Sequence, residues 1–244
     1  MPAEPPAVDS PPASTDEVHP GRPHVILSAA MSLDGHLDDN SPQRLLLSDA
    51  ADFDRVDALR AASDAVMVGA ETIRRDDPRL LVNDAGRREE RLRRGMPEFP
   101  LKVTVTGTGA LEAGARFFIT GGEKVVYCAD RAVAAQAERL RGAPRTEVVA
   151  AGELVDFPRI LADLKGRGVE RLMVEGGGSL HTRFLAEDLA DEIQLAIAPF
   201  FVGDDRAPRF VREADFPQNA QRRMTLAETR AIGDLVFVRY LIKR

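Results

Sequence analysis

Three consecutive glycines are the feature of this sequence with the clearest chemical use. Residues 176–178 follow the apolar run 172–174 and Glu175, and Ser179 and Leu180 then open a helix-like segment. A chain without Cβ atoms can turn from strand to helix and bring its backbone N–H groups close to an anion such as a dinucleotide pyrophosphate. A tight turn alone needs only one glycine, so three in a row favour ligand approach.

The position of these glycines argues against the common dinucleotide fingerprint. In the G-x-G-x-x-G register that starts at Gly176, the last place is occupied by His181, and the motif lies late in the chain. A nicotinamide reductase of a non-Rossmann kind fits better. Glu175 stands at the carboxyl end of its strand, where α/β sheets bind ligands. Taken alone, it is equally consistent with a carboxylate that supports the turn.

A second candidate is the pair of carboxylates Asp76 and Asp77, directly before Pro78. Two neighbouring carboxylates can share a proton or hold a polar ligand. The same tripeptide is also a common helix stop and turn sequence, and without further context the turn is favoured.

The elements that must position these residues alternate between strand and helix. This alternation predicts an α/β fold with a mostly parallel sheet, and the turn at Gly233 predicts a C-terminal antiparallel hairpin. The predicted strands are residues 24–31, 64–69, 101–106, 124–128, 146–150, 171–175, 191–199, 224–230 and 234–242. The hairpin is apolar on both faces, which indicates burial, and a partner subunit is one way in which it could be covered.

Helix signals fall between these strands. Ser48 is the expected N-cap of a helix that reaches about residue 62, with Phe53 and Leu59 on its apolar stripe. Asp130 is the expected cap of a helix over 130–141. The mixed-charge run 87–94 is expected to be a solvated loop or short helix, with an arginine for a substrate phosphate as the alternative.

Composition limits the function classes. The 33 Lys and Arg residues against 39 Asp and Glu give a net charge of −6, which argues against nucleic-acid and membrane-surface binding. A single cysteine and four scattered histidines exclude an internal disulfide and indicate no metal site. Residues 1–23 hold seven of the 16 prolines and are expected to be a disordered tail, before one domain over 24–244. We expect a cytoplasmic protein.

The motifs together resemble a known family. S-L-D-G at 32–35, V-G-x-x-T-x-x-x-D-D-P-R-L at 68–80, E-G-G-G at 175–178 and D-E at 191–192 are similar in order and spacing to the reductase domain of riboflavin biosynthesis. The resemblance implies a three-layer, dihydrofolate-reductase-like fold, a homodimer and NADPH as cofactor. It implies reduction of 5-amino-6-(5-phosphoribosylamino)uracil, or a close pyrimidine, to its ribitylamino form. The deaminase zinc signatures are absent from the sequence, so we expect a reductase only.

The resemblance also implies roles for single residues. Asp76 and Glu175 are the candidate catalytic residues. The implied cofactor-binding residues are Ala30, Thr72, Asp76, Gly176, Gly177, Gly178, Ser179 and Leu180. The implied substrate-binding residues are Ser28, Asp34, Arg60, Leu80, Asn83 and Glu175.

The substrate side departs from the family pattern more than the cofactor side does. Ser28 stands where the bacterial enzymes tend to carry a lysine, and Asn83 stands where an arginine often follows the D-D-P-x-L-T-V stretch. Two alternatives therefore stay open. One is a reductase of the same fold that acts on another pterin, pyrimidine or carbonyl compound. The other is a module that binds a dinucleotide without turnover.

Overall fold

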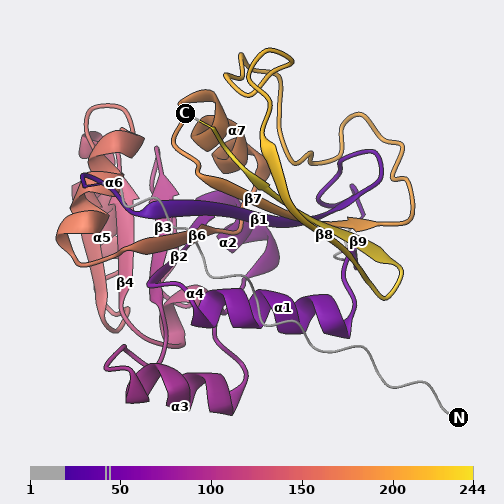
Figure 1. The fold of residues 1–244 in the computed structure, drawn as a ribbon. Coiled ribbons are helices and arrows are strands. Elements are labelled where there is room, and N and C mark those ends of the chain that lie inside the picture. Colours follow the sequence, from indigo (N-terminus) through magenta and orange to yellow (C-terminus); the bar gives the residue numbers. More distant parts are fainter. Residues whose placement is uncertain (1–19, 42, 44, 244) are drawn as a thin grey trace, which may run out of the picture.

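The computed structural model describes residues 20–41, 43 and 45–243. Its centre is a nine-stranded sheet in the order β5-β4-β3-β2-β6-β1-β7-β9-β8 (Figure 1). The strands are β1 (His24–Ser32), β2 (Ala65–Gly69), β3 (Leu101–Thr106), β4 (Lys124–Cys128), β5 (Thr146–Ala150), β6 (Arg171–Val174), β7 (Glu192–Ala198), β8 (Thr225–Ile232) and β9 (Leu235–Leu241). The helices are α1 (Ala50–Ala61), α2 (Ala70–Asp76), α3 (Ala85–Arg93), α4 (Arg116–Ile119), α5 (Val133–Arg139), α6 (Phe157–Gly166) and α7 (Gly178–Ala186), with a 3₁₀ turn η1 (Asp130–Ala132) before α5.

The pairing of the strands confirms the predicted α/β architecture. β1 to β7 pair in parallel, whereas β9 runs antiparallel to both β7 and β8. Each predicted strand is present within about two residues of its expected ends, because buried parallel strands consist of near-continuous apolar runs. The hairpin turns at Gly233, where φ is +55°.

Helices cover both faces of the sheet and give it three layers. On one face, α6 and α7 pack residues such as Phe157 and Phe184 against buried side chains of β1, β2 and β6. On the other face, α1, α2 and α4 pack residues such as Leu59, Ile73 and Phe117 against the opposite sides of the same strands. This is the dihydrofolate-reductase-like arrangement that the sequence predicted, and it fixes the carboxyl ends of β1, β2 and β6 relative to one another.

Two predicted helix caps are wrong. Asp49, and not Ser48, caps α1: its carboxylate accepts from the Asp52 N–H at 2.8 Å, while the Ser48 hydroxyl donates to the Asp52 carboxylate. Asp130 begins the 3₁₀ turn, and its carboxylate accepts from the Gly152 N–H across the adjoining loop. At α1 two neighbouring polar side chains compete for one helix end, whereas α5 begins after Ala132 with no side-chain cap because Asp130 is engaged by the adjoining loop.

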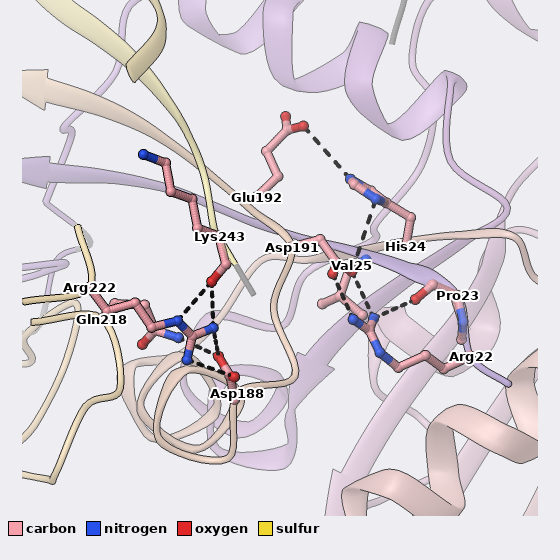
Figure 2. Close-up of polar contacts among 10 residues, drawn as sticks. All are labelled: Arg22, Pro23, His24, Val25, Asp188, Asp191, Glu192, Gln218, Arg222 and Lys243. Carbon is pink, nitrogen blue, oxygen red and sulfur yellow. Dashed lines mark hydrogen bonds and ion pairs between the residues drawn. The ribbon is translucent and has the colours of Figure 1, made fainter. Parts of the chain in front are cut away.

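At the start of β7, Asp191 and Glu192 bind arginines from distant parts of the chain (Figure 2). Asp191 accepts two hydrogen bonds from Arg22, at 2.6 and 2.7 Å, and one from the Val25 N–H. Fully buried Glu192 accepts two from Arg239, both at 2.8 Å. Arg22 lies in the segment that the sequence assigned to the tail, and the rest of that prediction, residues 1–19, lies outside the described residues.

Helices that could span a membrane are lacking in residues 20–41, 43 and 45–243, since none there is both long and apolar enough.

Candidate active site

A cavity of about 690 Å³ opens at the carboxyl ends of β1, β2 and β6. Parallel α/β sheets place their ligand sites at this edge. The cavity is lined by Ala29, Ala30, Leu37, Asp38, residues 45–48, Phe53, Gly69, Glu71, Thr72, Arg75, Asp76, Glu175, residues 177–180, Pro208 and Arg212. Residues of both motifs singled out in the sequence, 68–80 and 175–180, thus line the same cavity.

More of the predicted cofactor-binding residues than of the predicted substrate-binding residues line the cavity. The predicted residues that line it are Ala30, Thr72, Asp76, Glu175, Gly177, Gly178, Ser179 and Leu180. Those that are not among its lining residues are Ser28, Asp34, Arg60, Leu80, Asn83 and Gly176.

The three glycines at 176–178 differ in backbone conformation and in what an added Cβ would contact. Gly176 has a φ of +109°, a conformation that L side chains rarely adopt. A Cβ on Gly178 would overlap the backbone carbonyl oxygen of Arg209. Gly177 has an ordinary φ of −76°, and its added Cβ would meet only the Thr72 hydroxyl, at 3.4 Å. Backbone geometry therefore requires glycine at residues 176 and 178, whereas Gly177 lines the cavity without such a constraint.

The start of α7 presents donors to this cavity. The first N–H groups of a helix have no carbonyl partner within the helix. Here they belong to Gly178 and Ser179, which line the cavity directly after Gly177. Aligned peptide dipoles add positive potential at the same place, so the geometry suits a phosphate or pyrophosphate group.

Asp76 and Asp77 do not act as a pair. Asp77 ends α2 in the left-handed conformation, with φ of 42°, and its carboxylate accepts from the Arg116 N–H at 2.7 Å. Asp76, the last residue of α2, lines the cavity. The turn explanation therefore holds for Asp77, while Asp76 is placed where it can contact a ligand.

Glu175 reaches the cavity wall already engaged by Arg60. Arg60 donates from Nε to Oε1 at 2.6 Å and from Nη2 to Oε2 at 2.7 Å, and it also donates to the Leu81 carbonyl. Burial works against the charge of Arg60, but the Glu175 carboxylate outweighs it and raises the pKa of the guanidinium. The two side chains thus form one fixed unit, of which Glu175 faces the cavity.

Other predicted substrate residues make contacts within the protein. The Asn83 side chain donates to the buried carboxylate of Asp57, and Leu80 lies in the core with φ of 48°. Asp34 accepts hydrogen bonds from the Val202 and Gly203 N–H groups, and these bonds, with that from Ser32, hold its pKa well below its usual range.

Several lining residues were not singled out in the sequence. Phe53 was predicted on the apolar stripe of α1, yet it is 48% exposed and lies at the cavity with Leu46. Arg75 donates to Asp38 at 2.8 Å. Arg212 comes from the long connection between β7 and β8. Arg75 stands directly before the candidate residue Asp76, and this position is a signal that could have marked it. Nothing in the local sequence marks Arg212.

Comparison with known proteins gives the family. Residues 23–238 match the model of the RibD C-terminal domain. The chain belongs to this family. A member from Archaeoglobus fulgidus, named as a 2,5-diamino-6-ribosylamino-4(3H)-pyrimidinone 5′-phosphate reductase, is 39% identical over 77% of this chain and 85% of its own length. A protein of the same name from Methanothermobacter thermautotrophicus is 34% identical over 91% of this chain and 99% of its own.

Solved structures agree on the fold of this RibD C-terminal domain. A pyrimidine reductase-like protein from Corynebacterium diphtheriae superposes with a TM-score of 0.76 at 22% identity, and the match covers 91% of this chain and 92% of that one. At this level of identity the likeness establishes the fold alone.

Proposed function

We propose that this RibD C-terminal domain protein is an NADPH-dependent reductase of riboflavin biosynthesis. The observation that carries the proposal is the cavity itself, which joins an anion-binding helix start at residues 177–179 to two carboxylates, Asp76 and Glu175. The names of the two relatives above supply the chemistry, which is reduction of a ribosylaminopyrimidinone phosphate.

The residues present fit a dinucleotide. A Cβ at Gly177 would occupy cavity space that the backbone does not need, so a ligand can approach the chain closely there. The N–H groups of Gly178 and Ser179 would hold the pyrophosphate, with Ala30 and Thr72 beside the nicotinamide ribose. NADPH, when bound, supplies a hydride.

The reaction adds that hydride to C1′ of the open-chain imine and a proton to the adjacent nitrogen. The chain contributes chiefly by holding the two reacting carbons in contact and excluding water, which can account for much of a rate enhancement. Asp76 lies at the cavity where it can orient or protonate the nitrogen. Glu175, held by Arg60, can accept ring N–H groups of the pyrimidine.

We propose the diamino-pyrimidinone as the preferred substrate, with the phosphoribosylamino-uracil as the second candidate. The support is the substrate named for the two relatives, which cover most of this chain. The test compares kcat/KM for the two compounds under identical NADPH concentrations. A higher value for the uracil would reverse the assignment, and turnover of neither would favour another carbonyl substrate.

We also propose that the protein acts as a homodimer in the cytoplasm. β8 is an edge strand, and the hairpin exposes Leu226 and Val236, each about half accessible. Apolar side chains on a sheet edge are commonly covered by a partner subunit. Light scattering of the wild type against Leu226→Glu tests this, with a shift from dimer to monomer as the expected result.

A further inference from the structure

The connection between β7 and β8 delivers an arginine to the catalytic cavity. We propose that Arg212 binds a phosphomonoester of a ligand in this cavity. The inference rests on the proposed function, in which two ligands carry such a group: NADPH on its adenosine ribose and the pyrimidine on its 5′ carbon. Arg212 would then determine whether the phosphorylated form of one of them is preferred.

The balance of charge in the cavity singles out this residue. Among the residues that the structure describes, two arginines line it, Arg75 and Arg212. Arg75 is compensated, because it donates to the Asp38 carboxylate at 2.8 Å and to the Asp39 carbonyl at 2.7 Å. Within the part of the chain that the structure describes, no carboxylate forms an ion pair with Arg212. Its charge is therefore available to an incoming dianion.

The backbone of Arg212 is fixed in place. Its N–H donates to the Thr182 hydroxyl at 2.8 Å, and that hydroxyl donates to the Gly178 carbonyl at 2.7 Å. Two residues earlier, the Phe210 ring packs on buried His181, with ring centroids 4.8 Å apart. Arg212 is thereby held against the first turn of α7, so little loop ordering is needed when an anion binds.

Arginines that the sequence offered for the substrate, Arg60 and those of the run 87–94, include three that are engaged elsewhere. Arg87 pairs with Asp54 and Asp57, and Arg91 is buried with backbone carbonyls as acceptors. Arg60 donates to both oxygens of Glu175. None of the three lines the cavity. A guanidinium can bind a phosphate bidentately, and among the described arginines that line the cavity Arg212 is the one without a carboxylate partner.

The experiment uses matched ligand pairs that differ by one phosphomonoester. Calorimetry gives Kd for NADPH and NADH, and steady-state kinetics gives KM for the pyrimidine 5′-phosphate and its dephosphorylated form. The variants are Arg212→Gln and Arg212→Lys, and the control is Arg206→Gln, a loop arginine that is 87% exposed. Thermal melting confirms that each variant is folded.

We expect Arg212→Gln to weaken the phosphorylated member of one pair by roughly 10- to 100-fold, and its partner by less than about twofold. Arg212→Lys should fall between, because it keeps the charge and loses the planar fork. The affected pair identifies the source of the phosphate. Equal losses within both pairs, or no loss in either, would overturn the inference. Failure of the wild type to bind either dinucleotide would instead refute the proposed function.

Discussion

Replacing Glu175 with glutamine tests whether its pair with Arg60 serves both stability and substrate recognition. The substitution keeps the shape and one carbonyl oxygen, and it removes the charge and one of two bonds of 2.6 and 2.7 Å. The two side chains are only 14% and 18% exposed, so Arg60 would be left charged and poorly compensated.

The magnitude follows from these contacts. A hydrogen bond to a charged group contributes about 1.5–3 kcal/mol, and loss of one member of a fully buried pair costs about 3–5 kcal/mol. Because both groups keep some solvent contact, we expect Glu175→Gln to lower the free energy of unfolding by about 2 kcal/mol. Urea unfolding at neutral pH measures it from the midpoint at constant slope.

The same variant separates the two roles. If Glu175 also contacts the pyrimidine, kcat/KM should fall by roughly 5- to 150-fold, the equivalent of about 1–3 kcal/mol, while Kd for NADPH changes less than about twofold. The double variant Arg60→Met with Glu175→Gln is the control. It should recover part of the lost stability and none of the activity. If the losses of stability in the single variants Arg60→Met and Glu175→Gln add strictly in the double variant, the pairing is refuted. Equal losses of cofactor and substrate binding in Glu175→Gln would make Glu175 purely structural.

Further predictions concern the glycines, the buried acid and the N-terminal contact. Gly178→Ala should destabilise the fold by about 1–3 kcal/mol through overlap with a backbone carbonyl, whereas Gly177→Ala should leave the melting temperature unchanged and weaken NADPH by about tenfold, as calorimetry would show. Burial favours the neutral form of Glu192, yet hydrogen bonds and the charge of Arg239 outweigh it and lower its pKa to about 2. Its contribution, about 3 kcal/mol, should be complete above pH about 4.5 and disappear as the pH falls through about 2, so the stability difference between wild type and Glu192→Gln should vanish in acid. Arg22→Ala should lower the melting temperature by about 2–4 °C for each kcal/mol lost, and removal of residues 1–19 should not lower it; the reverse result would place the domain boundary elsewhere.

β8 is exposed along most of its length, and the turn at Gly233 is what marks it in the sequence. The sequence predicts β1, β2, β3, β4, β6 and β7 well because these strands are largely buried and therefore appear as apolar runs. It predicts the glycine turn for a similar reason, since three missing side chains are a local signal. The part of the cavity proposed to bind the cofactor is built largely from residues 69–76 and 175–180, two segments of this kind.

The surroundings of the residues predicted to bind the substrate depend on contacts that no local pattern contains. Arg60 and Glu175 are 115 positions apart, and the capture of Asn83 by Asp57 depends on how α1 meets the start of α3. Leu80 adopts a positive φ without being glycine or asparagine, so its sequence gives no hint of that conformation. Arg212 reaches the cavity only because the connection after β7 folds back over α7.

Hydride transfer from NADPH to the ribosyl carbon of the pyrimidine phosphate is the step on which the proposed function depends. The most direct measurement supplies NADPH that carries deuterium at the transferred position, together with the diamino-pyrimidinone phosphate, and analyses the product by mass spectrometry and NMR. We expect one NADPH to be oxidised for each product formed, with a single deuterium at C1′ of a ribitylamino chain. Cofactor binding without oxidation, or a product free of deuterium at C1′, would contradict this expectation.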